Sequence, residues 1–154
     1  GTRFVAKESL FRIPVLGWAI GAAGFVPIDR SNLGKAMKSL EKAGARIRAG
    51  NSVILFPEGT RSRDGNLRTF KKGAFHLALK AGVPVVPVTI QGSFSRLRPS
   101  TLWITPGKVT VHFGDLIDTS EYSENQVADL RDRLQKGIAG TLDRLRAESG
   151  GEDR

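Results

Sequence analysis

The sequence predicts an α/β fold, with a single domain in which a largely parallel mixed sheet is flanked by helices. Short apolar segments alternate along the chain with segments of helical periodicity, which is typical of strand–helix–strand units. The chain has 154 residues and is 40% apolar, which is enough for one domain with a hydrophobic core. Residues 52–56 also form the kind of continuous apolar strand that parallel sheets bury on both faces.

The N-terminal third alternates between strand and helix. The expected elements, in chain order, are a strand, a helix, a second strand and a second helix: residues 2–6, 8–21, 25–28 and 31–49. Pro14 lies at an early turn of the first helix or breaks it. Ser31 or Asn32 can cap the second helix, which Gly50 stops.

The remainder continues the alternation. After the strand at residues 52–56 we expect a polar loop, a helix, a strand, a longer loop and a half-exposed strand: residues 57–69, 70–80, 84–90, 91–106 and 107–113. Gly82 closes the helix, and Pro87 indicates an edge position or a bulge in the strand that follows. The loop contains one short strand near Trp103.

The last element is a long amphipathic helix. Ser123 and Gln126 have the spacing of a capping box, which predicts the start of this helix. Its apolar positions recur at helical spacing: Val127, Leu130, Leu134, Ile138, Leu142 and Leu145. We therefore expect one domain over residues 1–148 and a disordered tail over residues 149–154.

Composition excludes several classes of site. The chain has no cysteine, which excludes a disulfide scaffold, a thiolate metal site and a cysteine nucleophile. Its two histidines, His76 and His112, are far apart in sequence, so no metal site is expected. His76 has apolar neighbours and is interpreted as structural, whereas His112 is expected on the surface. Trp18 and Trp103 are interpreted as packing or interface anchors.

Positive charge is concentrated in the first two-thirds of the chain. The net charge is +9, and residues 1–98 hold 17 basic and 5 acidic residues, against 7 and 10 in residues 99–154. This distribution indicates an anionic partner for the first part, or a solvated basic surface. The longest apolar stretch, residues 14–28, is shorter than the roughly 20 residues that a spanning helix needs.

The clearest candidate site is the segment Phe-Pro-Glu-Gly-Thr-Arg-Ser at residues 56–62. It follows a predicted buried strand, and ligands of open α/β sheets bind beyond the carboxyl ends of the strands. Gly59 permits a close backbone approach, Thr60 offers a hydroxyl, and Arg61 can grip a phosphate with two hydrogen bonds. Glu58 can accept from a hydroxyl or orient the arginine. The alternative is a polar turn with a surface ion pair.

Two further residues are weaker candidates for the same site. Arg30 ends the stretch Gly-Phe-Val-Pro-Ile-Asp-Arg at residues 24–30, at the start of a predicted helix, where anions are favoured. The alternative for Arg30 is a surface residue beside a helix cap. Lys7 ends the first predicted strand and can face the same crevice.

These motifs together resemble the glycerophospholipid acyltransferases of the 1-acylglycerol-3-phosphate acyltransferase type. Residues 56–62 match that family's third motif, residues 24–30 its second, and residues 83–88 its fourth, the Val-Pro-Val-Val-Pro-Val strand. The segment Phe-Lys-Lys-Gly-Ala at residues 70–74 is typical of it too, and order and spacing agree over about residues 3–118.

The family's first motif is not in this chain. It is a histidine followed, after four residues, by an aspartate, and in the family the histidine acts as general base. Here the corresponding positions after His76 and His112 are Ala81 and Ile117. The resemblance therefore predicts a glycerolipid acyltransferase fold that is truncated at its N-terminus, with no catalytic residue in this chain and no activity of the chain alone.

The resemblance also implies substrates and surroundings. The acceptor is a lysophospholipid, the donor is acyl-CoA or an acyl carrier protein, and phosphatidic acid is the product in phospholipid biosynthesis. Arg61, Lys7 and Arg30 are implied to hold the acceptor phosphate, with Glu58, Gly59 and Thr60 beside it, and no cofactor or metal is implied. We expect association with the cytoplasmic face of a membrane.

Two other functions remain open at this point. One is a non-catalytic relative that binds lipid or phosphate. The other is a basic nucleic-acid-binding module, which explains the charge but leaves the segment from Glu58 to Arg61 without a role. Such a module also needs exposed aromatic residues among the basic ones, so no nucleic acid is expected as a partner.

Overall fold

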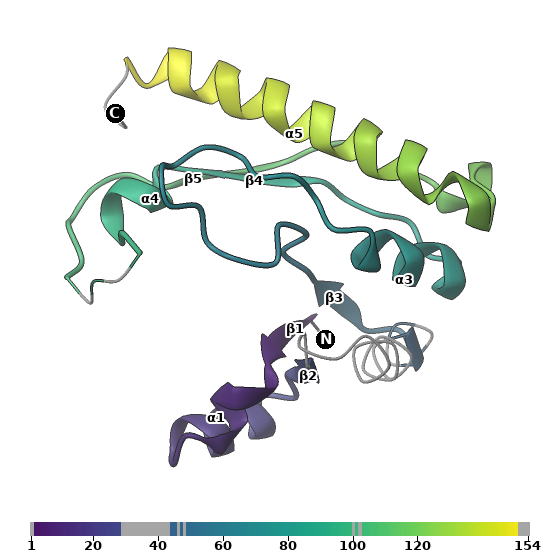
Figure 1. Ribbon diagram of the computed structural model, residues 1–154, viewed down its shortest axis with the longest axis horizontal. Coiled ribbons are helices and arrows are strands. Elements are labelled where there is room, and N and C mark those ends of the chain that lie inside the picture. The colour runs from purple at the N-terminus through teal and green to yellow at the C-terminus, as the bar shows by residue number, and fades with distance from the viewer. Residues whose placement is uncertain are drawn as a thin grey trace.

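The structure is a computed structural model that describes residues 2–28, 44, 45, 47, 49–99, 101 and 103–150. Its strands form two small sheets, and a long C-terminal helix runs along one of them (Figure 1). The elements in chain order are β1 (Thr2–Lys7), the 3-10 helix η1 (Glu8–Arg12), α1 (Leu16–Ala22), β2 (Val26–Ile28), β3 (Ser52–Ile54), α3 (Gly73–Ala81), β4 (Val88–Gln91), α4 (Ser93–Arg96), β5 (Thr110–Phe113), the 3-10 helices η2 (Thr119–Glu121) and η3 (Glu124–Gln126), and α5 (Val127–Glu148).

The first sheet is parallel and has the strand order β2-β1-β3. Lys7 of β1 pairs with Ile28 of β2, and Phe4 of β1 pairs with Ile54 of β3. Because all three strands run in the same direction, their carboxyl ends lie at one edge of the sheet. The chain leaves β3 at this edge and enters the polar loop that holds the principal candidate residues.

The second sheet is an antiparallel pair, in which Val88 lies opposite Phe113 and Ile90 opposite Val111. The expectation of one largely parallel mixed sheet is therefore wrong for the described strands. Pro84 and Pro87 have no N–H to donate, so β4 begins only at Val88 and the segment before it contributes a single bridge, between Val85 and Ile117. The long connection to β5 lets the chain reverse and pair antiparallel.

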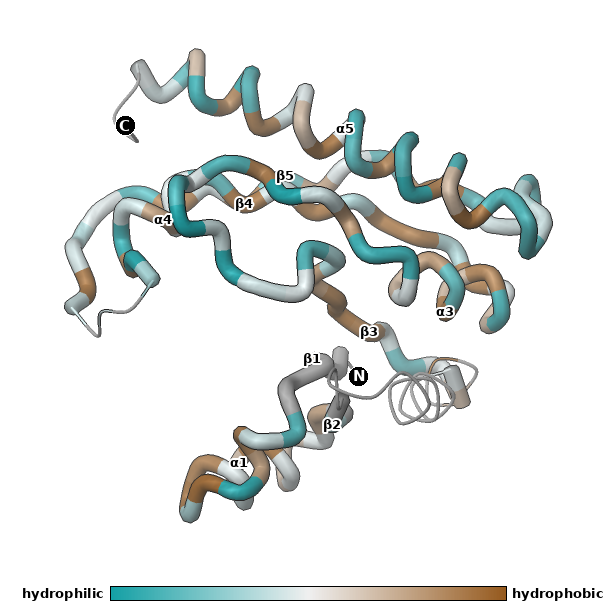
Figure 2. Tube along the Cα trace, viewed as in Figure 1, coloured by the Kyte–Doolittle hydropathy of each residue, from teal (hydrophilic) through white to brown (hydrophobic). Residues whose placement is uncertain are grey.

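The hydrophobic core lies between α5, α3 and the chain segments beside β4. Its buried residues are Phe70, Phe75, Ile117, Val127, Leu130 and Leu134. Leu130 is fully buried, at 0% exposure, and the apolar residues of α5 lie on the side of the helix that faces the sheet (Figure 2). The predicted apolar stripe of the C-terminal helix is thus confirmed, because each of its residues is buried or packs on this core.

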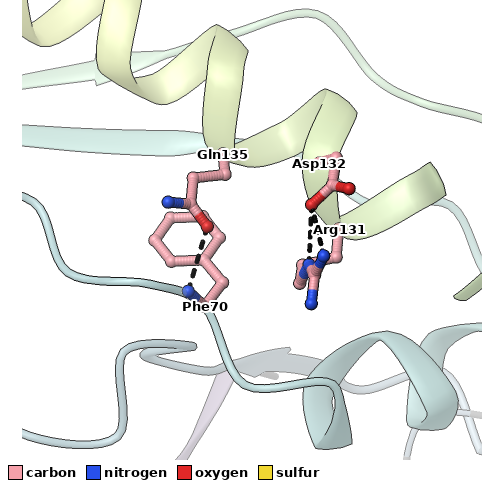
Figure 3. Close-up of polar contacts among 4 residues, drawn as sticks. All are labelled: Phe70, Arg131, Asp132 and Gln135. Atoms are coloured by element: carbon pink, nitrogen blue, oxygen red, sulfur yellow. Dashed lines mark hydrogen bonds and ion pairs between the residues drawn. The ribbon is translucent and has the colours of Figure 1, made fainter. Parts of the chain in front are cut away.

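Polar contacts fix the segments around the core. The backbone N–H of Phe70 donates to Oε1 of Gln135 on α5 over 3.0 Å (Figure 3). The Thr119 hydroxyl donates to the carbonyl of Val83 over 3.0 Å, and the Gln91 amide donates to the Ser149 hydroxyl over 3.2 Å. These bonds satisfy polar groups that burial would otherwise leave without partners.

Several predicted boundaries are confirmed. Gly82 closes α3 with the left-handed φ of 61° that a glycine accommodates without strain, and Ser123 and Gln126 form the capping box. The first predicted helix is interrupted around Pro14, into η1 and α1. The second predicted helix, at residues 31–49, lies almost wholly outside the described residues, as do residues 151–154 of the predicted tail.

Two local predictions are wrong. Residues 52–56 are not buried on both faces, since Ile54 is 36% exposed and Phe56, just beyond β3, is 57% exposed. Among the described strands, β3 lies at the edge of the parallel sheet. The described residues around Trp103 form no strand, and the preceding loop instead begins with the short helix α4.

We expect Leu130→Ala to lower the free energy of unfolding by about 2–5 kcal/mol, because it opens a cavity at a fully buried position. Urea unfolding followed by circular dichroism measures the change. Leu116→Ala is the matched control: Leu116 is 61% exposed, so its truncation should change stability by less than about 0.5 kcal/mol. Equal losses from the two variants would contradict the assigned core.

Candidate acceptor-binding loop

The loop that follows β3 starts with a tight turn. The N–H of Gly59 donates to the carbonyl of Phe56 over 3.0 Å, which closes a turn over Pro57 and Glu58. Gly59 itself has a φ of 74°, in the left-handed region that favours glycine. The sequence therefore needs a glycine here so that the chain can turn directly after the strand.

The far end of the loop returns to this turn. The N–H of Lys71 donates to the carbonyl of Pro57 over 2.8 Å, and the N–H of Arg68 donates to Oε2 of Glu58 over 2.9 Å. The side chain of Lys71 also lies against Gly59, where an added Cβ would come within 3.2 Å of its Cδ and Cε. Residues 57–71 thus form a closed loop in which the carboxylate of Glu58 joins the two ends.

The middle of the loop folds around Asp64. Its carboxylate accepts hydrogen bonds from the Ser62 hydroxyl at 2.8 Å and from the backbone and side-chain N–H groups of Asn66 at 3.1 and 3.0 Å. Because these donors stabilise the ionised form, with Ser62 contributing most, they lower the pKa of Asp64 from 3.8 to about 2. Asp64 is therefore charged whenever the loop is folded near neutral pH.

The loop is attached to the rest of the molecule next to Asp64. A guanidinium N–H of Arg146 on α5 donates to the carbonyl of Gly65 over 2.7 Å. The ring of Phe94 on α4 lies against Gly65 as well, and a Cβ there would come within 3.0 Å of the ring. Two helices distant in sequence thus hold the middle of the loop in place.

Arg61 and Thr60 are the exposed polar members of the motif. Within the part of the chain that the structure describes, the Arg61 guanidinium makes no hydrogen bond or ion pair, and Glu58 is engaged by the Arg68 N–H and not by Arg61. The alternative of a Glu58–Arg61 surface ion pair is therefore not what the structure shows. A guanidinium held on a folded loop without a protein partner is suited to bind an anion.

The other two predicted site residues are placed only in part. Lys7 is the last residue of β1, at the same edge of the parallel sheet from which the loop departs. The described residues fix its backbone position and say nothing of its side chain. Arg30 lies outside the described residues.

Both histidine interpretations need correction. His76 is exposed on α3 rather than structural, because Phe75 and Ala78 supply the buried face of that helix. His112 is half-buried rather than on the surface, and its Nε2 lies 3.4 Å from a guanidinium nitrogen of Arg144 on α5. The strand alternates as predicted, but with the opposite face toward α5.

Asp64 and Lys71 also shape the site, although neither was predicted from the sequence. The Asp-Gly pair at residues 64–65 is a recognised turn signal and could have identified the first. Nothing local identifies Lys71, because its contact with Gly59 joins positions twelve residues apart. Only the closure of the loop brings its side chain to the motif.

An open hollow of about 400 Å³ lies next to the end of the loop, lined by Thr69, Arg131, Asp132, Gln135, Lys136 and Ala139. Of its two cationic residues, Arg131 is paired with Asp132 at 2.7 Å, which leaves Lys136 (Figure 3). The hollow therefore presents less positive charge than the loop does. Within the described ranges no group of His, Asp and Glu side chains is arranged to hold a metal ion.

Comparison with known proteins gives a consistent assignment. Residues 1–91 match the family model described as Acyltransferase. The chain belongs to the acyltransferase family. It is 40% identical over 130 residues to a 1-acyl-sn-glycerol-3-phosphate acyltransferase from Limnanthes douglasii, and 39% identical over 140 residues to one from Haemophilus influenzae. These matches cover 84% and 88% of this chain.

A solved structure supports the same fold. The crystal structure of the 1-acyl-sn-glycerophosphate acyltransferase PlsC from Thermotoga maritima matches with a TM-score of 0.81 and 33% identity, over 95% of this chain. The chain spans about half the length of the relatives it matches: 46% of the Limnanthes protein, 58% of the Haemophilus protein and 57% of the Thermotoga chain. The α/β fold expected from the resemblance is therefore confirmed.

We expect the carboxyl of Asp64 to titrate with a midpoint near pH 2, which carbon-detected NMR can measure. Because the folded pKa lies below 3.8, the carboxylate stabilises the loop above pH 3.8, and this contribution is lost as the pH falls toward 2. Ser62→Ala removes the strongest donor and should move the midpoint upward. A midpoint of 3.8 in the unmodified chain would show that the loop is not folded around Asp64.

Proposed function

We propose that this chain is the acceptor-binding part of an acyltransferase that converts 1-acylglycerol-3-phosphate to phosphatidate. The observation that carries the proposal is Arg61, a guanidinium without a partner among the described residues, on a loop that is folded and fixed at both ends. Membership of the acyltransferase family supports the reaction class. The acceptor is inferred from the relatives, which are named 1-acyl-sn-glycerol-3-phosphate acyltransferases. We place the reaction in phospholipid biosynthesis, at the cytoplasmic face of a membrane.

Arg61 is the main ligand of the acceptor phosphate in this proposal. Its planar fork donates two parallel hydrogen bonds to phosphate oxygens, and the exposed Thr60 adds its hydroxyl. Lys71 lies against Gly59 and adds a second positive charge beside the turn. Glu58 keeps one carboxylate oxygen on the Arg68 N–H, and its other oxygen accepts from a glycerol hydroxyl.

The acyl transfer requires a base that these residues do not supply. The acceptor hydroxyl attacks the carbonyl carbon of an acyl thioester of coenzyme A or acyl carrier protein, the C–S bond breaks, and the thiolate leaves. The hydroxyl proton passes to the base. The chain contains no histidine followed after four residues by an aspartate, and His76 and His112 lie on α3 and β5, outside the loop of residues 57–71. These 154 residues therefore bind the acceptor without acylating it.

Within the described ranges, no helix is both long enough and apolar enough to cross a membrane. In this proposal the chain takes its lipid acceptor from the surface of the bilayer, to which the basic first two-thirds of the sequence is electrostatically attracted.

We expect Arg61→Ala to weaken binding of a short-chain lysophosphatidate roughly 10- to 100-fold, because charge-assisted hydrogen bonds contribute about 1.5–3 kcal/mol each. Isothermal titration calorimetry on the 154-residue chain measures the dissociation constant. Arg61→Lys keeps the charge but loses the fork, so it should restore only part of the affinity.

Two controls separate phosphate recognition from folding. Monoacylglycerol, which has no phosphate, should bind equally to the wild type and to Arg61→Ala. Arg144→Ala removes an exposed arginine from α5 and should leave the affinity for lysophosphatidate unchanged. A loss of affinity in Arg61→Ala that is equal for both lipids would show that Arg61 is structural.

We expect the 154-residue chain to show no transfer of a labelled acyl group from acyl-CoA or acyl carrier protein to lysophosphatidate. General-base catalysis alone contributes about 10²–10⁴-fold, and neither histidine of the chain is followed after four residues by the aspartate of the family's first motif. Thin-layer chromatography of the labelled lipids measures the product. Robust turnover would assign the base to a residue of this chain and would overturn the division of roles proposed above.

A further inference from the structure

The most exposed aromatic side chain described lies at the tip of the loop between α4 and β5. In this tryptophan loop, defined as the described residues of 97–109, Trp103 is 83% exposed and Ile104 is 71% exposed. Large apolar side chains in contact with water are unfavourable by roughly 25 cal/mol per Å². Two such residues at adjacent positions of a loop tip indicate a surface that another phase or molecule covers.

The tryptophan loop has defined internal contacts. At its base, the N–H of Thr105 donates to the carbonyl of Arg96 over 2.9 Å, and Nη1 of Arg96 donates to the carbonyl of Pro106 over 2.9 Å. The guanidinium of Arg96 lies directly against Gly107. Near the tip, the N–H of Trp103 donates to the Thr101 hydroxyl over 3.0 Å. Arg96 thus holds the base closed while the tip projects Trp103 outward.

The charge around the loop has a single sign. Residues 65–114 contain no Asp or Glu, and their basic residues are Arg68, Lys71, Lys72, Lys80, Arg96, Arg98 and Lys108. Arg98 and Lys108 are exposed and lie on the two sides of Trp103 in the chain. By contrast, α5 carries acidic and basic residues in nearly equal number, four acidic and five basic. An anionic surface is therefore attracted more strongly to the loop than to that helix.

We propose that the tryptophan loop is a membrane-contact site, in which Trp103 and Ile104 insert into the interfacial region of an anionic bilayer while Arg98 and Lys108 meet lipid phosphates. The inference rests on the proposed function and deepens it, since it names the part of the chain that meets the surface holding the lipid acceptor. Tryptophan is enriched at membrane interfaces because its ring is apolar and its N–H is polar. Basic residues near an anionic leaflet strengthen binding by electrostatic attraction to the lipid phosphates.

The size of the tip favours a bilayer over a protein partner. A stable protein interface buries about 800 Å² on each side, with a packed apolar centre. A projecting tip with two apolar side chains provides little of such a centre, but insertion into a fluid interface needs no complementary pocket. The flanking cations then remain at the level of the headgroups.

The loop is mechanically linked to the acceptor-binding loop. Phe94 of α4, directly before the tryptophan loop, packs on Gly65. The Arg98 guanidinium lies 6.0 Å from the centre of the Phe94 ring. A membrane that contacts the tryptophan loop therefore acts on α4, the helix that supports the loop carrying Arg61. This arrangement places acceptor recognition near the membrane surface.

The test is vesicle binding by the full 154-residue chain in a Trp18→Phe background, which leaves Trp103 as the only tryptophan. Equimolar phosphatidylcholine–phosphatidylglycerol vesicles should shift the Trp103 emission to shorter wavelength, and brominated lipids should quench it. Pure phosphatidylcholine vesicles should bind much more weakly. No acyl donor or lysophosphatidate is present, so the outcome does not depend on whether the acceptor site or the acyl transfer is assigned correctly.

Matched variants, compared by vesicle sedimentation, identify the residues responsible. Trp103→Ala should lower the partition coefficient about tenfold, whereas Leu116→Ala, which truncates an exposed apolar residue beside Asp115, should not. Arg98→Ser with Lys108→Ser should lower it about tenfold or more on anionic vesicles, whereas Arg133→Ser with Lys136→Ser, which remove two cations from α5, should have little effect.

Three results would overturn the proposal. The first is Trp103 emission that does not change on anionic vesicles, and the second is an equal loss of vesicle binding in the loop variants and in their controls. The third is unchanged vesicle binding by Trp103→Ala together with weakened binding to acyl carrier protein. The last result would assign the loop to a protein partner instead. Circular dichroism of each variant confirms that it is folded before binding is compared.

Discussion

The contact between Phe70 and α5 is the constraint on which the rest of the described structure depends. The Phe70 ring is buried at 4% exposure in the core, and its N–H is bonded to Gln135. Phe70 lies near the end of the loop at residues 57–71 and shortly before α3. The first buried residue of α3, Phe75, stacks on Phe70 with 6.3 Å between the ring centres. Phe70 thus couples the loop to the hydrophobic core, so the loop keeps its geometry as long as the core is folded.

The carboxylates of the loop at residues 57–71 are engaged in hydrogen bonds within the loop, whereas Arg61 is exposed. Glu58 accepts from the Arg68 N–H, and Asp64 accepts from Ser62 and Asn66. Both carboxylates are bonded to backbone or neutral donors rather than to guanidinium groups. Neither carboxylate of the loop therefore neutralises the charge of Arg61. The same carboxylates that shape the loop thereby make it a better receptor for an anion, because none of them competes for the arginine.

Charge is also distributed unevenly along the chain. Residues 65–114 carry seven basic residues and no acidic ones, whereas α5 carries four acidic and five basic residues. The helix packs on this basic part through its apolar stripe and through hydrogen bonds, such as the one from the Phe70 N–H to Gln135 and the one from the Arg146 guanidinium to the Gly65 carbonyl. Compared with α5, residues 65–114 therefore carry the larger excess of positive charge.

The sequence by itself determined the family, the α/β class, the long helix from Val127 and the segment from Glu58 to Arg61, because these depend on periodicity, caps and a motif within a few residues. It did not determine which face of β5 meets α5, since Val111 and His112 alternate identically in either orientation. That choice follows from the antiparallel pairing with β4, which turns Thr89 and His112 to the same face. The contacts of Lys71 with Gly59 and of Arg146 with Gly65 were also decided by tertiary structure. These contacts join residues that are far apart in sequence and that come together only when α5 packs and the loop closes. A pattern within a few residues therefore cannot predict them.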